Sequence, residues 1–331
     1  MFSRKTLTLA TLFAFSVPPP VLAQAAATPA ASLSYPTRPI RLIMPFPPGG
    51  ATDANARALA KEMEGTLGQP VVVDNRGGAN GIIGSDIVAK ATPDGYTLMH
   101  ISVAFAINPS TYKKLPFDPI RDFTPITNPI VGHGALLLVH PSLPARSVTE
   151  LIAVAKKQQI VFSSPGIGNV LHLINEAFNA RAGIRMLHVP YKGSGPALMA
   201  LLGAESQVMV VPPLTATPYV KAERLRALGY SGAKRLETMP DLPTISEAGL
   251  PGFQSDTGWH AWFAPAKTPD RIVMRIYNAI LKAVHTPRMR EVFTTAGYQP
   301  VADPPAVFQK NVAADIKRWE EIVRSARITP E

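Results

Sequence analysis

The chain has 331 residues, a formal net charge of +10 and no cysteine. This length allows two domains with sizeable cores. The lack of cysteine excludes disulfides, thiolate metal ligands, cysteine nucleophiles and a lipid attached to an N-terminal cysteine. The positive charge is dispersed in isolated pairs, such as Lys113–Lys114 and Lys156–Lys157, with no aromatic residues between them. We therefore expect no nucleic-acid partner.

The N-terminus has the pattern of a secretory signal. Arg4 and Lys5 precede an apolar run over residues 7–17 that is too short to span a bilayer, and residues 21–23 offer a small-residue cleavage site. We predict a signal peptide at residues 1–23 and a flexible lead-in at residues 24–34. An uncleaved N-terminal anchor is the alternative interpretation. Cleavage predicts a soluble periplasmic protein.

The next segment contains a glycine turn that could hold an anion. Residues 40–44 form an apolar run typical of a buried strand, the turn Pro45–Gly50 ends it, and Thr52 or Asp53 would cap a following helix. Two glycines before a helix let backbone N–H groups approach an anion, and the helix dipole adds partial positive charge. The turn therefore predicts a carboxylate cradle. An ordinary strand–turn–helix is the alternative, and no Gly-Lys-Ser/Thr follows as in a P-loop.

Strands and helices then alternate, which favours an α/β fold with parallel strands. A second glycine loop, Ser164–Asn169, precedes a helix, and the stretch 109–129 is a proline-rich connection without a predicted element. Ligands of such sheets bind beyond the carboxyl ends of the strands, where these loops gather. The expected strands are 71–73, 96–101, 135–139, 160–163, 185–189 and 207–211, and the expected helices are 83–91, one capped by Ser147, 170–182 and 196–202.

Several motifs at compatible spacing occur together in one known family. They include Tyr35-Pro-x-x-Pro-Ile40, Pro45-Phe-Pro-Pro-Gly-Gly-x-Thr-Asp53, Pro93-Asp-Gly-Tyr-Thr-Leu98 and His188-Val-Pro-Tyr-Lys-Gly193. The chain resembles the Bug (TctC-like) periplasmic solute receptors of tripartite tricarboxylate transporters over nearly all of its mature length. The resemblance implies a two-domain periplasmic-binding-protein (Venus flytrap) fold, an α/β fold of parallel-rich mixed sheets with the ligand cleft between the lobes.

The resemblance also implies where the chain is divided. In this family the chain crosses between domains twice, and the crossings fall near residues 130–134 and 252–259 here. Domain 1 would then be discontinuous, with residues 35–133 and 254–331. Domain 2 would be an inserted lobe of residues 134–253.

The resemblance further implies that one ligand carboxylate is held largely by backbone N–H groups, partly through water, between the two glycine loops. Here Pro48 replaces a residue that usually has an N–H donor, and Asn169 replaces a usual hydroxyl residue. Either change could alter the choice of ligand. Ser102 and Asn108 on one side, and Tyr191 and Ser194 on the other, are candidates for the walls of the site. The predicted ligand-binding residues are Pro48, Gly49, Gly50, Ala51, Thr52, Ser102, Ser164, Gly166, Ile167, Gly168, Asn169, His172 and Tyr191.

The expected function is a monomeric receptor that delivers a small carboxylate to the membrane components of a tripartite tricarboxylate-type transporter. A ligand-sensing receptor without a transporter is one alternative. We expect no enzymatic activity and no cofactor, and the seven histidines have no metal-binding spacing. The ligand itself stays open between dicarboxylates, aromatic acids and nicotinate-like acids.

Three side chains have a second interpretation. Gly229–Ala233 loosely fits a nucleophile elbow, so a secreted serine hydrolase with Ser231 as nucleophile is a second alternative function. His172 could lie at the pocket rim or be an ordinary helical histidine. His260, between Trp259 and Trp262, could pack in the core or form part of an aromatic lid.

Overall fold

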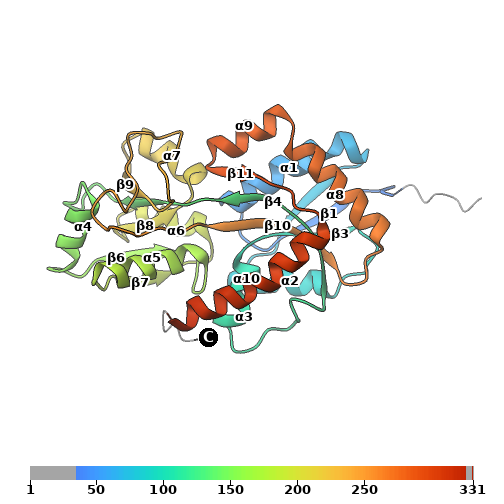
Figure 1. The fold of residues 1–331 in the computed structure, drawn as a ribbon, viewed down its shortest axis with the longest axis horizontal. Helices are drawn as coiled ribbons and strands as arrows, with labels where there is room; N and C mark the ends of the chain where they lie inside the picture. Colours follow the sequence, from blue (N-terminus) through green and yellow to red (C-terminus); the bar gives the residue numbers. More distant parts are fainter. Residues whose placement is uncertain (1–34, 326–329, 331) are drawn as a thin grey trace, which may run out of the picture. The chain divides into compact units, whose positions relative to one another are not determined.

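The computed structural model describes residues 35–325 and residue 330, so the predicted signal peptide and lead-in lie outside the described residues. Most of the predicted strands and helices are present within a few residues of their expected bounds (Figure 1). In chain order the elements are β1 (Ile40–Met44), α1 (Ala51–Leu67), β2 (Val71–Asn75), the 3-10 turn η1 (Ala79–Gly81), α2 (Ile82–Ala89), β3 (Thr97–Ser102), α3 (Ala104–Thr111), β4 (Phe123–Gly132), β5 (Leu136–Val139), α4 (Val148–Ala155), β6 (Val161–Ser164), α5 (Val170–Ala182), β7 (Leu187–Pro190), α6 (Ser194–Leu202), β8 (Val208–Val211), α7 (Pro213–Lys221), β9 (Arg226–Tyr230), β10 (Gly258–Pro265), α8 (Asp270–Val284), α9 (Pro287–Thr295), β11 (Tyr298–Pro300) and α10 (Pro305–Ser325).

The strands form two mixed sheets. The six-stranded sheet has the order β11-β4-β10-β3-β1-β2, in which β1 pairs in parallel with β2 and β3, while β10 is antiparallel to both β3 and β4. The five-stranded sheet has the order β7-β6-β8-β5-β9, in which β6 is parallel to β7 and β8 and β5 is antiparallel to β8 and β9. The structure therefore confirms the predicted α/β class with mixed sheets.

The chain passes between the two sheets twice. β4 belongs to the six-stranded sheet and β5 to the five-stranded sheet, so the first passage lies between Gly132 and Leu136. The return lies between Tyr230 at the end of β9 and Gly258 at the start of β10. Figure 1 shows the elements from β5 to β9, in green and yellow, gathered on one side of the described chain.

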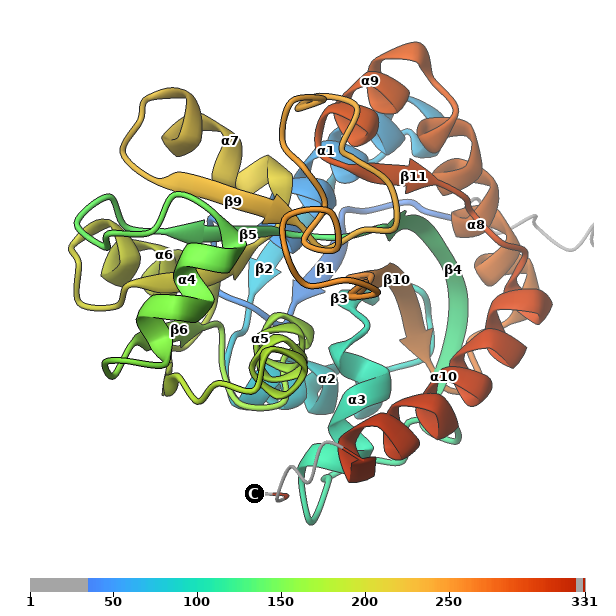
Figure 2. The ribbon, with the colours of Figure 1, turned by 60° about the vertical axis from the view of Figure 1, so that its left-hand side comes forward.

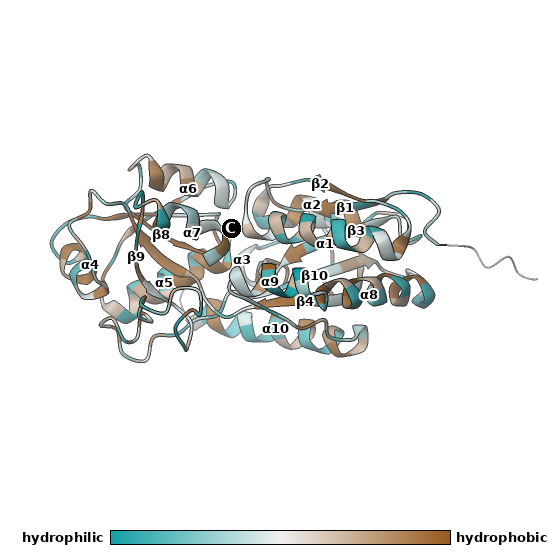
Figure 3. Cartoon of the chain, turned by 90° about the horizontal axis from the view of Figure 1, so that it is seen from above, coloured by the Kyte–Doolittle hydropathy of each residue, from teal (hydrophilic) through white to brown (hydrophobic). Residues whose placement is uncertain are grey.

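The hydrophobic pattern explains how the sheets are covered. All four residues of β5 and of β8 are buried, as in strands packed on both faces. Helix α8 is amphipathic and buries Ile276 and Ile280 on the larger sheet, and Figure 3 shows polar residues on its outer side. The last helix, α10, packs along α3 and β4, as Figure 2 shows. Among the described residues, no helix combines the length and apolar character needed to cross a membrane.

One local prediction was wrong, and one strand was missed. Helix α1 begins at Ala51 with Gly50 as its N-cap, so neither Thr52 nor Asp53 caps it. The proline-rich stretch contains the end of α3 and most of β4, a strand with Pro125 and Pro129 in it. The register of β4 against β10 shifts near Pro125, and this irregularity accommodates a residue without an N–H.

Candidate functional site

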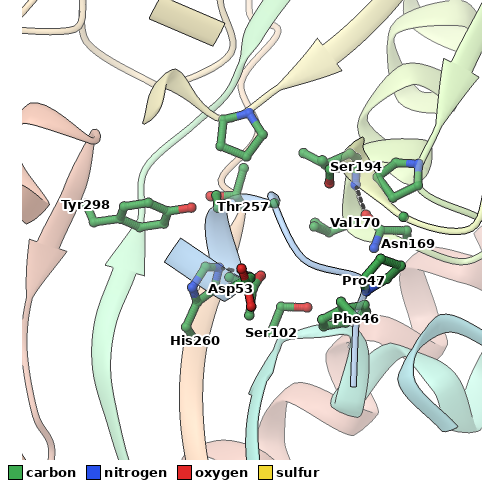
Figure 4. Close-up of a pocket in the computed structure, with 17 residues that line it drawn as sticks. Phe46, Pro47, Asp53, Ser102, Asn169, Val170, Ser194, Thr257, His260 and Tyr298 are labelled. Carbon is green, nitrogen blue, oxygen red and sulfur yellow. Dashed lines mark hydrogen bonds between the residues drawn. The ribbon is translucent and has the colours of Figure 1, made fainter. Parts of the chain in front are cut away.

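A cavity of about 50 Å³ lies where loops of the two sheets meet. Its lining comes from the loop after β1, the first turn of α1, and β3, β10 and β11 on the side of the larger sheet, and from the segments after β6, β7 and β8 of the smaller one (Figure 4). The lining residues are Phe46, Pro47, Gly50, Ala51, Thr52, Asp53, Ser102, Pro165, Asn169, Val170, Leu171, Gly193, Ser194, Pro212, Thr257, His260 and Tyr298.

Four helices begin at this cavity. The N-caps of α1, α5, α6 and α7 are Gly50, Asn169, Gly193 and Pro212, and all four line it. The first hydrogen bond of α1 runs from Ala54 N to Gly50 O, so the three preceding N–H groups have no partner within the helix. Each N-terminus carries partial positive charge, and those of α1, α5 and α6 also have unpaired N–H donors, whereas α7 begins with Pro212 and Pro213, which have no N–H. Their convergence makes the cavity suitable for a small anion.

Charged side chains contribute little to this suitability. Among the described residues, the lining includes neither lysine nor arginine, and its one carboxylate is Asp53. Asp53 is buried, and both of its oxygens are bound by donors: Arg57 contacts both, Asn75 Nδ2 lies 2.9 Å from Oδ1, and Gly49 N lies 3.2 Å from Oδ2. Burial by itself raises the pKa of Asp53, but these hydrogen bonds and the guanidinium of Arg57 outweigh it and lower the pKa. Asp53 therefore stays ionised and fixes the turn before α1.

Of the predicted ligand-binding residues, five line the cavity: Gly50, Ala51, Thr52, Ser102 and Asn169. Pro48 and Gly49 are exposed outside it, and the N–H of Gly49 is already bonded to Asp53. Asn169 caps α5 through Leu171 N and also donates to Asn80 Oδ1 at 3.2 Å, a contact that joins the second loop to η1. The Asn169 amide therefore connects two parts of the chain beside the cavity.

The rest of the second glycine loop bonds to its own surroundings. Ser164 Oγ lies 2.6 Å from His188 Nε2, and Gly166 N donates to Ser164 Oγ. His172 accepts from Gly168 N and stacks on His188, with ring centroids 4.0 Å apart. The predicted residues that do not line the cavity are Pro48, Gly49, Ser164, Gly166, Ile167, Gly168, His172 and Tyr191.

The opposite side of the cavity carries hydroxyl and imidazole groups. The side chains of Thr257, His260 and Tyr298 are each at most 5% exposed and line this side. Figure 4 shows Tyr298 on the side of the cavity opposite Asn169 and Ser194, with its hydroxyl pointing toward Thr257 and the cavity. Burial lowers the pKa of His260 to about 3, so its ring is neutral at ordinary pH. His260 therefore belongs to the cavity wall as well as to the core.

Sequence reasoning missed most of this side. Thr257 follows a loop with no motif of its own, and Tyr298 lies in a three-residue strand near the C-terminus. Ser194, in the third glycine-containing loop Tyr191–Gly195, was a predicted wall residue, and it lines the cavity at the start of α6, on the same side as Asn169.

Ser231 does not have the surroundings of a nucleophile. It is fully buried, its Oγ accepts from Ala135 N at 2.9 Å, and it donates to Ser255 O at 2.8 Å. No histidine is among its hydrogen-bond partners in the described chain, and no helix opens after β9 as an elbow requires. Its role in this structure is to join the two passages between the sheets. The described residues also contain no cluster of three or more His, Asp or Glu side chains that could hold a metal ion.

Comparison with known families agrees with this geometry. The model of a family described as tripartite tricarboxylate transporter family receptor, TctC, matches residues 55–328. The chain belongs to the TctC family. Protein BugT of Bordetella pertussis (strain Tohama I) is 37% identical over 303 residues, which cover 90% of this chain and 92% of BugT. The predicted family is therefore confirmed.

Solved structures of similar proteins share the TctC fold. The periplasmic binding protein BugD aligns with a TM-score of 0.85 at 33% identity, covering 90% of this chain and all of BugD. An R. palustris protein solved with adipate aligns with a TM-score of 0.86 at 33% identity, with 90% and 100% of the two chains covered. MatC from Rhodopseudomonas palustris with bound malate aligns with a TM-score of 0.79 at 32% identity, with 87% and 100% covered. The fold is that of a periplasmic binding protein.

Proposed function

We propose that the protein captures a small carboxylate in the cavity and delivers it to the membrane components of a tripartite tricarboxylate-type transporter. The observation that carries the proposal is the meeting of four helix N-termini in a cavity whose described lining includes no cationic side chain. Backbone donors of this kind bind an anion without an arginine clamp. Two similar receptors were solved with adipate and malate, which are carboxylates.

The proposal includes two lobes that close on the ligand. We assign residues 35–133 and 254–331 to one lobe and residues 134–253 to the other. The passages of the chain between the sheets, at 132–136 and 230–258, support these bounds. Hinge motion at two connecting segments is the usual way in which such a cleft closes. We expect the protein to work as a monomer in the periplasm after removal of residues 1–23.

Native mass spectrometry of the purified protein tests the ligand class, because a tight receptor carries its ligand through purification. We expect a bound small acid. Calorimetry then compares that acid with its methyl ester, and the ester should bind about ten- to a hundredfold more weakly because charge-assisted hydrogen bonds are lost. Equal affinity of acid and ester would contradict a carboxylate site at the helix N-termini.

A further inference from the structure

The cavity side opposite the N-termini of α5 and α6 has hydroxyl groups without partners. Thr257 Oγ1 and Tyr298 Oη are both buried and have no partner among the described residues that meets hydrogen-bond distance and geometry, although the side chain of Asn55 lies close to Tyr298 Oη. A buried polar group left unpaired costs about 1–3 kcal/mol, and such groups in native structures call for an explanation. Because both residues line the cavity, a bound molecule can supply the missing partner.

The backbone makes room for these two hydroxyls. Gly132 at the end of β4 pairs with Gly258 of β10 on one side and with Tyr298 of β11 on the other. A Cβ at position 132 would overlap Thr257 Oγ1 and would approach the Tyr298 ring to 3.0 Å. Thr257 is also fixed by its backbone, whose N–H donates to Gly132 O at 3.0 Å. Because Gly132 has no side chain, the Thr257 hydroxyl and the Tyr298 ring fit beside the end of β4.

His260 adds a third uncharged group. Its Nδ1 lies 3.3 Å from Asn55 Nδ2; with the amide in this orientation Nδ1 accepts, and the proton of the neutral ring is on Nε2. Nε2 lies 3.5 Å from Thr52 Oγ1, a residue that lines the cavity at the start of α1. The pKa of His260, about 3, keeps this ring from supplying a positive charge. The polar groups on this side are therefore all neutral.

A second carboxylate finds no cation on this side of the cavity. Among the described residues, none of the lining side chains is lysine or arginine, and the ionised Asp53 also faces the cavity. Burying an anion is costly unless an opposite charge or several donors meet it. A neutral oxygen accepts from a hydroxyl without that cost. The cavity of about 50 Å³ has space for roughly four water-sized groups, which suits a short ligand.

We propose that Thr257, Tyr298 and His260 form a subsite for an uncharged oxygen, hydroxyl or carbonyl, so that the preferred ligand is a short hydroxy- or oxo-monocarboxylate rather than a dicarboxylate. This rests on the proposed function, since the helix N-termini are taken to hold the single carboxylate. The subsite determines specificity at the far end of the ligand.

Calorimetry at pH 7.5 with matched four-carbon acids tests this subsite. The probes are butyrate, its 2-, 3- and 4-hydroxy derivatives, 2-oxobutyrate and succinate. We expect at least one hydroxy or oxo acid to bind about tenfold or more tightly than both butyrate and succinate. Tyr298→Phe and Thr257→Val should each weaken binding of that acid about five- to tenfold and leave butyrate unchanged, since each removes one neutral hydrogen bond.

Matched variants separate the subsite from a general loss of folding. Thr257→Ser keeps the hydroxyl and should keep the affinity, and Tyr277→Phe removes a tyrosine hydroxyl that does not line the cavity. If succinate binds most tightly, or if Tyr298→Phe weakens butyrate and the hydroxy acid equally, the subsite is wrong while the carboxylate function stands. If none of the probes binds, the short-ligand class is wrong, and the acid–ester comparison judges the proposed function separately.

Discussion

Gly50 is the residue where the first glycine loop meets the third. A Cβ at this position would lie 3.6 Å from Ser194 Cβ, an ordinary contact, and the backbone φ of −85° suits any residue. Gly50→Ala should therefore bind the ligand within about threefold of the original protein. Gly50→Val places two methyl groups in the narrow space between the loops and should lower affinity at least about tenfold, roughly 1.4 kcal/mol, as measured by calorimetry. Full affinity of a folded Gly50→Val protein would place the anion elsewhere.

Backbone strain in this loop lies at the preceding residue. Gly49 has a φ of +90°, a conformation that costs a residue with a Cβ about 1–2 kcal/mol. Its missing side chain would have met nothing within 4 Å. The two glycines therefore have different roles. Gly49 adopts the positive φ that the turn requires, and Gly50 leaves space for Ser194.

Asp53 connects this turn to the body of the larger sheet. Asp53→Asn removes the charge that accepts from Arg57 and Gly49 N, and we expect the free energy of unfolding to fall by about 1–3 kcal/mol. The loss is limited because the partner Arg57 is half exposed and regains water. Urea unfolding measures the change. Glu64→Gln on the same helix breaks only the exposed pair with Lys61 and should cost well under about 1 kcal/mol; equal losses would refute a special role for Asp53.

The local sequence predicted the glycine loops at the helix N-termini better than it predicted the cavity wall formed by Thr257 and Tyr298. A glycine loop followed by a helix is visible in the chain, and Gly50, Ala51, Thr52 and Asn169 could be placed on that ground. Thr257 and Tyr298 reach the cavity only because β10 and β11 both pair with β4, a tertiary fact with no local signature.

At the scale of elements, most strands were predicted because they are short apolar runs between turns. β4 was missed because its prolines are typical of loops, and only its pairing with β10 and β11 makes it a strand. The start of α1 was placed late because Thr52 and Asp53 are common N-caps. In the structure Asp53 lies one turn inside, where its side chain reaches back to Gly49 N.

The Ser231 hydroxyl joins the two passages between the sheets, alongside backbone hydrogen bonds. Ser231 Oγ links Ala135 N in the first passage to Ser255 O in the second, and its own N–H donates to Ala135 O. Ser231→Ala leaves the buried Ala135 N–H unpaired and should lower the free energy of unfolding by about 1–3 kcal/mol. Ser255→Ala removes a hydroxyl with only one weak bond, at 3.4 Å, and is the control in the same urea experiment. A loss of ester hydrolysis in Ser231→Ala would instead support the hydrolase alternative.

For the whole molecule, buried histidines contribute to the loss of stability in acid. Burial, and then the neighbouring His172, lower the pKa of His188 to about 4, and burial lowers that of His260 to about 3. Both groups bind fewer protons when folded than when unfolded, where the pKa is about 6.5. Above pH 6.5 both rings are neutral in the folded and the unfolded protein, so they do not change the free energy of unfolding. As the pH falls from about 6.5 toward 3, the unfolded protein binds more protons, and the folded protein loses stability.

Urea unfolding between pH 8 and pH 4.5 checks this direction. We expect a plateau above pH 6.5 and a decline below it. His188→Asn removes less than one of the protons that are taken up on unfolding, because His188 keeps some contact with solvent. The slope of the free energy of unfolding against pH should therefore fall by less than about 1.4 kcal/mol per pH unit. Stability that rises on acidification to pH 5 would contradict the neutral state of these rings.

Closure around the ligand concerns both sheets at once. The N-termini of α5, α6 and α7 reach the cavity from the smaller sheet, and that of α1 reaches it from the larger sheet. An anion bound to all of them therefore holds the two sheets together. The contact from Asn169 Nδ2 to Asn80 Oδ1 acts in the same direction without a ligand. We therefore expect ligand to compact the protein, and Asn80→Ala to shift the free protein toward an open form with a weaker apparent affinity.

Small-angle scattering with and without ligand measures this closure. The radius of gyration should fall on binding in both proteins, with the larger change in Asn80→Ala because its free state is more open. Titrations at low and high salt complete the test. The anion is met by fixed dipoles inside the closed cleft rather than by exposed cations, so salt should weaken binding only modestly. An unchanged radius of gyration together with a steep salt dependence would indicate an open site on the surface, and the two lobes would then have no part in holding the ligand.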